Sequence, residues 1–119
     1  MNAAMGVTAI DLFRSGNATT PRLHRVRTTG PNADVDLYQD PASGDDWVRA
    51  NGKGVSTWDS VDPTRAGVPW RLAAGSQYPN SLKVWNDDPG HWVWEPTADM
   101  KLSDYVAALE VAGQGFVKV

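Results

Sequence analysis

The chain has 119 residues, 41% of them hydrophobic and 21% charged, which suits one globular domain. The net charge of −3 argues against a protein held to nucleic acid by bulk positive charge, and the lack of cysteine excludes disulfides, thiolate metal sites and cysteine nucleophiles. Because there are only two histidines, we expect no metal site, and no apolar run is long enough to cross a membrane. The N-terminus lacks a basic region followed by an apolar one, so we expect no signal peptide and a cytoplasmic location.

Residues 1–21 are small and polar, apart from a short apolar motif around Leu12 and Phe13. They end in a stretch of Gly, Asn and Thr before Pro21, which is typical of a loop. We therefore expect residues 1–21 to form a flexible N-terminal arm, which is partly disordered or packs through Leu12 and Phe13, and residues 22–119 to form the folded domain.

Short strands separated by turn residues are predicted along most of the remaining chain. Alternation of apolar and polar residues between Gly, Pro and Asn predicts strands at 22–28, 35–39, 54–58, 70–72, 82–86, 91–95 and 115–119. The turn formed by Asp88, Pro89 and Gly90 predicts that the strands on either side of it pair antiparallel.

One helix is predicted near the C-terminus, with Ser103 as its N-cap. Leu102, Val106 and Leu109 recur there at helical spacing. Residues 45–50 are compatible with one further helical turn. We therefore expect an α+β fold, a small strand-rich single domain of two packed antiparallel sheets with one or two short helices.

The predicted strand from His91 to Glu95 concentrates unusual side chains. It carries one of the two histidines and two of the six tryptophans. Because successive side chains of a strand point to opposite faces, Trp92 and Trp94 share one face, and His91, Val93 and Glu95 share the other. This pattern predicts the wall of a site, and it also fits an antiparallel sheet with one solvated face.

Ser56 and Thr57 place two hydroxyl groups side by side on another predicted strand. The two side chains must point to opposite faces. The serine can bond a neighbouring charged group, and the threonine can bond backbone or a ligand. Threonine is also common in strands for its shape alone, so the pair has a purely structural interpretation as well.

Arg25 is the central residue of a basic cluster that also contains Arg22, His24 and Arg27. A guanidinium group can hold a phosphate or pyrophosphate through two parallel hydrogen bonds, which a lysine cannot do. The alternative is that Arg25 and Arg27 lie on a solvated face.

Four segments, taken in their order along the chain, resemble one toxin family: residues 23–26, 54–58, 82–84 and 91–100. The family is that of the cytoplasm-acting effector toxins of the type VI secretion system, whose fold looks like an ADP-ribosyltransferase. The most specific part is the His-aromatic strand, followed by Pro96 and then by Met100.

The resemblance implies an NAD-dependent toxin that binds NAD, as its substrate, in a cleft between two small sheets. Arg25 would hold the dinucleotide, and Ser56 and Thr57 would line the nicotinamide pocket. His91 would take the position of the family's functional histidine. We add Trp58, or one of Trp92 and Trp94, as a residue that stacks on a ring of the dinucleotide, because aromatic side chains favour such contacts. No metal is implied.

The chain departs from the pattern of many ADP-ribosyltransferases, which use a catalytic glutamate. It has only two glutamates, Glu95 and Glu110, and no Glu-x-Glu motif. In a strand, Glu95 would lie roughly 13 Å from His91. A toxin of this kind implies an immunity protein as partner and an unknown macromolecular target, whereas membrane and nucleic-acid partners are not expected.

Two other functions remain open from the residues themselves. A metal-independent ribonuclease toxin could use His91 and Glu95 as base and acid, with Arg25 and Arg27 as a phosphate clamp. A non-enzymatic binding module for sugars or a protein partner could instead use the six tryptophans.

Overall fold

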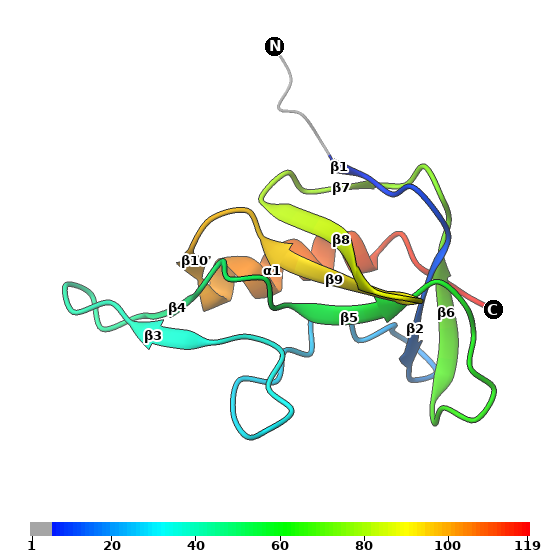
Figure 1. The fold of residues 1–119 in the computed structure, drawn as a ribbon, viewed down its shortest axis with the longest axis horizontal. Helices are drawn as coiled ribbons and strands as arrows, with labels where there is room; N and C mark the ends of the chain where they lie inside the picture. Colours follow the sequence, from blue (N-terminus) through cyan, green and yellow to red (C-terminus); the bar gives the residue numbers. More distant parts are fainter. Residues whose placement is uncertain (1–5) are drawn as a thin grey trace, which may run out of the picture.

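The computed structural model describes residues 6–119, and Figure 1 shows their arrangement. The elements, in chain order, are β1 (Gly6–Val7), β2 (Leu12–Gly16), β3 (Leu37–Gln39), β4 (Asp46–Val48), β5 (Val55–Trp58), β6 (Val68–Leu72), β7 (Gln77–Tyr78), β8 (Leu82–Asp88), β9 (His91–Pro96), β10 (Met100–Lys101), α1 (Leu102–Gly113) and β11 (Val117–Lys118). Within the described residues, no helix is long and apolar enough to span a membrane.

The strands of residues 6–119 form three antiparallel sheets. The large sheet has the order β11-β6-β2-β5-β9-β8, the second has the order β10-β4-β3, and β1 pairs with β7. Figure 1 shows the second sheet at the left and β2 and β6 running steeply across the right-hand end of β5. The predicted strand-rich α+β class with antiparallel sheets is confirmed, with three sheets in place of two and one helix in the described part.

The predicted flexible arm is wrong for residues 12–16. They form β2, an inner strand of the large sheet that lies between β5 and β6, and Leu12 is only 1% exposed. Leu12 pairs with Leu72 of β6, and Phe13 pairs with Trp58 of β5. Packing through Leu12 and Phe13, the alternative expected for this segment, is therefore what occurs at residues 12–16. The part of the arm before residue 6 lies outside the described residues.

The predicted hairpin around Pro89 is confirmed. Strands β8 and β9 pair antiparallel from Leu82 opposite Pro96 to Asn86 opposite Trp92, with an irregularity between Asn86 and Asp88. Strand β5 also lies where the sequence predicted a strand. The turn between β8 and β9 contains Gly90, and β5 follows Gly52 and Gly54. Such turn residues are the local signal that made these strands predictable.

Two local predictions are wrong. Residues 22–28 form an irregular segment in place of a strand, with Leu23 fully buried and Arg22 at a φ of 59°. Leu23 anchors this segment to the core and Val26 packs against it, but they lie three residues apart, which is not the spacing of one strand face. Residues 46–48 form β4, not a helical turn, because they pair with β3 and β10 on both sides.

Helix α1 follows β10 without a connecting loop, so Lys101 occupies the N-cap position and the predicted N-cap, Ser103, lies inside the helix. The helix buries Tyr105, Ala108 and Leu109 against the core. It lies behind β9 in Figure 1. The Tyr105 hydroxyl donates a hydrogen bond to the Trp94 carbonyl and accepts one from the Val55 amide at 3.2 Å. This tyrosine therefore fixes the helix to both β5 and β9.

Candidate functional site

Strands β5 and β9 bring Ser56, Trp58 and His91 to one face of the large sheet. Trp58 lies opposite His91, and Ser56 lies two residues earlier on the same face of β5. The His91 Nε2 atom is 2.7 Å from the Ser56 Oγ atom, and the imidazole and indole centroids are 5.7 Å apart. Three of the predicted site residues therefore meet.

Thr57 points to the opposite face and is fully buried. Its hydroxyl donates to the Trp92 carbonyl at 3.2 Å and accepts from the Trp94 indole at 3.0 Å. A ligand would have to displace core side chains to reach it. Thr57 is therefore a structural residue, and its predicted roles in catalysis and in lining a nicotinamide pocket do not fit its position.

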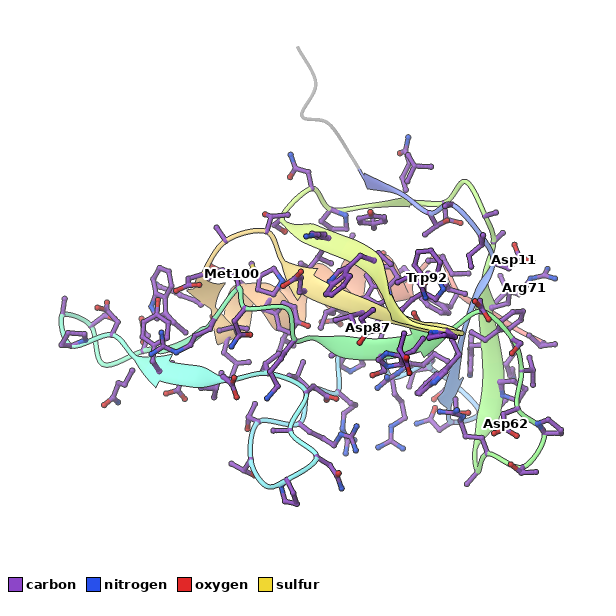
Figure 2. The ribbon with its side chains drawn as sticks, viewed as in Figure 1. Asp11, Asp62, Arg71, Asp87, Trp92 and Met100 are labelled. Atoms are coloured by element: carbon purple, nitrogen blue, oxygen red, sulfur yellow. The ribbon has the colours of Figure 1, made fainter. Side chains whose placement is uncertain are left out.

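Asp87 is a site residue that the sequence analysis missed. It lies in β8, and its Oδ1 atom is 2.6 Å from the Nδ1 atom of His91. Figure 2 labels Asp87, as well as Trp92 of the neighbouring strand β9. The sequence showed Asp87 only as part of a turn-like run of aspartates, but its spacing of four residues from His91 across a tight hairpin was a usable signal.

Arg14 is a second missed residue. It extends from β2 so that one guanidinium nitrogen donates to the Ser56 carbonyl at 2.6 Å and another donates to the Arg22 carbonyl at 3.2 Å. Its Nε atom is buried without a hydrogen-bond partner among the described residues. Burial lowers the pKa of Arg14 from its ordinary value. The sequence analysis missed Arg14 because this residue lies in the segment that was expected to be a flexible arm.

Arg25 is exposed and does not contact the Ser56–His91 pair directly. It lines a neighbouring hollow of about 280 Å³ together with Arg14, Arg22 and Arg27. The three arginines of the predicted basic cluster thus gather here, whereas its fourth member, His24, lines a different hollow. Arg14 is the arginine that donates a hydrogen bond to the Ser56 carbonyl.

Three hollows follow one another along this face of the molecule. Ser56 and His91 line a cleft of about 280 Å³, which shares Arg27 with the arginine hollow. The arginine hollow in turn shares Arg14 with a third hollow of about 290 Å³, which Trp58 lines. Shared lining residues make these hollows neighbours.

The tryptophans offer less open surface than the sequence suggested. The guanidinium of Arg65 lies 3.5 Å from the centroid of the Trp58 ring and covers one of its faces. Trp94 is fully buried, and Trp92 packs against the core and donates from its indole to Asp59 at 3.3 Å. The pair in β9 therefore forms no open stacking platform.

The two glutamates lie away from the Ser56–His91 pair. Glu95 is 6% exposed, accepts a hydrogen bond from the Gly52 amide at 2.7 Å and lies 3.6 Å from the Lys83 ammonium. Glu110 is exposed on α1. Asp87 is therefore the carboxylate that contacts the imidazole. Within residues 6–119, no three His, Asp or Glu side chains gather as a metal site would require.

Comparison of the chain with known proteins finds no match. No protein-family model, no curated protein and no solved structure is similar enough to count as one. The functional argument therefore depends on the geometry of the Ser56–His91 cleft and its neighbours, together with the sequence resemblance.

Proposed function

We propose that this chain is an NAD-dependent toxin with an ADP-ribosyltransferase-like fold that acts in the cytoplasm of bacterial target cells and is neutralised by an immunity protein. One observation carries the proposal. A serine and a histidine in hydrogen-bond contact lie beside an arginine-lined hollow, and the two hollows share Arg27. The resemblance to type VI effector toxins, which includes the segments of Ser56 and His91, also supports it.

The arginine hollow suits the pyrophosphate of a dinucleotide. Arg25 is exposed there, and Arg14 and Arg27 border the adjoining hollows. Guanidinium groups bind phosphate oxygens through paired, charge-assisted hydrogen bonds. With its phosphates at this position, a dinucleotide can extend one half into the Ser56–His91 cleft and the other half towards Trp58.

Bound NAD supplies an activated ribose whose bond to nicotinamide breaks during the transfer. In this arrangement the Ser56 hydroxyl and the His91 imidazole hold the ribose hydroxyls in place. The carboxylate of Asp87 faces His91 and provides a negative charge in this cleft for a ribose that becomes positively charged. The chain thereby compensates for the absence of a Glu-x-Glu motif.

Calorimetry with NAD, combined with an assay of nicotinamide release, tests this function. We expect Arg25→Ala to weaken NAD binding about tenfold, the equivalent of about 1.4 kcal/mol. Arg71→Ala is the matched control, because Arg71 is exposed on β6 and lies outside the three hollows. Absence of both NAD binding and nicotinamide release in the folded protein would refute the proposal.

Expression in bacteria tests the toxin itself. We expect the chain to arrest growth, and Ser56→Ala or His91→Gln to remove this effect while the protein still accumulates. Growth arrest that persists in both variants would place the toxic activity elsewhere. Degradation of RNA in a purified translation system without NAD would instead indicate the ribonuclease alternative.

A further inference from the structure

Ser56, His91 and Asp87 form a continuous chain of two hydrogen bonds. The Asp87 carboxylate lies 2.6 Å from Nδ1 of His91, and Nε2 of the same ring lies 2.7 Å from Ser56 Oγ. An ionised carboxylate can only accept, so Nδ1 carries the proton and donates it. In the neutral ring Nε2 is then the acceptor for the serine hydroxyl. In this arrangement Ser56 has the position of a nucleophile, His91 that of its base, and Asp87 that of the carboxylate that orients the imidazole.

The backbone holds this trio in place. Ser56 lies in β5, which pairs with β2 and β9 on its two sides, and His91 is the first residue of β9. The irregular pairing between Asn86 and Asp88 falls at Asp87, and such bulges commonly redirect a side chain near a functional site. The side-chain amide of Asn86 donates hydrogen bonds to the backbone carbonyls of Asp88 and His91, at 2.7 and 2.9 Å. These bonds hold the hairpin closed around Asp87.

The trio is also accessible to a small molecule. All three residues line the cleft of about 280 Å³, and the side chains of His91 and Asp87 are 26% and 29% exposed. Arg27 and Lys53 line the same cleft. Both are already paired, Arg27 with Asp34 and Lys53 with Asp36, each at 3.1 Å, so an oxyanion next to Ser56 would compete with these carboxylates for them.

We propose that Ser56 is an activated nucleophile and that the chain has a second activity, the hydrolysis of small carboxylic esters. The Ser56 oxygen bonds to the ester carbonyl carbon while its proton moves to Nε2 of His91. The bond to the leaving alcohol breaks, and the alcohol takes that proton. A water molecule then attacks the acylated serine, passes a proton through His91 back to the Ser56 oxygen and releases the acid. This activity requires no NAD.

Reaction with a fluorophosphonate tests the nucleophile directly. Activated serines form a bond from Oγ to phosphorus and release fluoride, and mass spectrometry identifies the modified residue. We expect the native protein to be labelled at Ser56 in the absence of NAD, and p-nitrophenyl acetate to be hydrolysed. Asp87→Asn and His91→Gln should slow labelling at least about 100-fold. Asp87→Glu keeps a carboxylate, so it should be labelled faster than Asp87→Asn and more slowly than the native protein.

Ser60→Ala is the matched control, because Ser60 is an exposed hydroxyl of the same region that lies outside this cleft. It should leave labelling at Ser56 unchanged. Circular dichroism of every variant ensures that a slow rate reflects chemistry and not unfolding. A folded native protein that is not labelled at Ser56, or an Asp87→Asn variant labelled at the native rate, would overturn the assignment. Labelling without NAD binding would support this activity and refute the NAD-dependent one.

Discussion

Tyr105 shows how a single buried hydroxyl connects the helix to the site. Its oxygen bonds the Trp94 carbonyl of β9 and the Val55 amide of β5, and its side chain is fully buried. Both backbone groups belong to the strands that carry His91 and Ser56. The separation of those two side chains therefore depends on a tyrosine on the far face of the sheet.

Replacing Tyr105 with phenylalanine keeps the ring and removes the hydroxyl. The Val55 amide and the Trp94 carbonyl then lose a buried partner, which costs about 1–3 kcal/mol of the free energy of unfolding. Urea denaturation measures this loss. An unchanged unfolding midpoint would show that neither bond stabilises the protein. Tyr38→Phe is a suitable control, because its hydroxyl bonds Asp99 at an exposed position.

Tyr105 also predicts how stability depends on alkaline pH. Burial raises the pKa of this tyrosine above its ordinary value of 10.0. Above pH 10 the unfolded chain has lost the tyrosine proton while the folded chain keeps it. The free energy of unfolding therefore falls as pH rises from there, by up to about 1.4 kcal/mol per pH unit, and the contribution is fully present below pH 10. Tyr105→Phe should remove this part of the slope in urea titrations between pH 9 and pH 12.

The sequence predicted some site residues and missed others for identifiable reasons. Ser56 and His91 lie on strands with clear alternation and bounding turns, so their shared site was foreseeable. Asp87 faces His91 only because the strand pairing is irregular there. Arg14 reaches Ser56 across a pairing between segments more than 40 residues apart, and local patterns do not report such distances.

At the scale of elements, the contact between β5 and β9 depends on Gly54. A Cβ atom at this position would lie 2.0 Å from the Trp94 carbonyl oxygen, which belongs to the backbone and cannot move aside without separating the strands. The absence of a side chain therefore permits the close approach that precedes Ser56.

Gly54→Ala should consequently destabilise the protein by about 1–3 kcal/mol, the usual cost of overpacking, and widen the distance between Ser56 and His91. Thermal unfolding and the cross-strand amide contacts seen by NMR would measure the two effects. Gly113→Ala is the control, because a Cβ there would meet its neighbours at an ordinary 3.7 Å and the backbone has no positive φ. Retention of native stability by Gly54→Ala would contradict the predicted clash.

Elements with strong local signals were predictable, whereas those defined by distant partners were not. The β8–β9 hairpin has a Pro-Gly turn, and α1 has a helical stripe of apolar residues. Strand β4 has three residues and exists because β3 and β10 pair with it on both sides. The loop at residues 22–28 has a strand-like alternation in its sequence, but only Leu23 is buried there, and Arg25 and Arg27, which would share its face in a strand, are exposed.

At the scale of the whole molecule, β2 joins the two halves of the large sheet. Strands β6 and β11 lie on one side of it, and β5, β9 and β8 lie on the other. The three-sheet arrangement was not predictable, because β2 pairs with segments that follow it by about 40 to 60 residues. Such pairings leave no periodic trace in the sequence around residue 12.

Deletion of residues 1–16 should therefore abolish cooperative folding, because it removes the inner strand and leaves β5 and β6 without their common partner. Thermal unfolding followed by circular dichroism would show the loss of the transition. Deletion of residues 1–5 is the control, since every pairing among the described strands remains. A cooperative transition in the protein that lacks residues 1–16 would mean that β2 is dispensable for folding.

The position of Tyr105 after both site strands has a consequence for protein synthesis. A ribosome makes β2, β5 and β9 before it reaches the residue that joins β5 and β9 to the helix. A polypeptide released early, between residues 97 and 104, would carry Ser56, Asp87 and His91 yet lack this connection. The positions of these three side chains are therefore fixed only after the ribosome has also synthesised Tyr105.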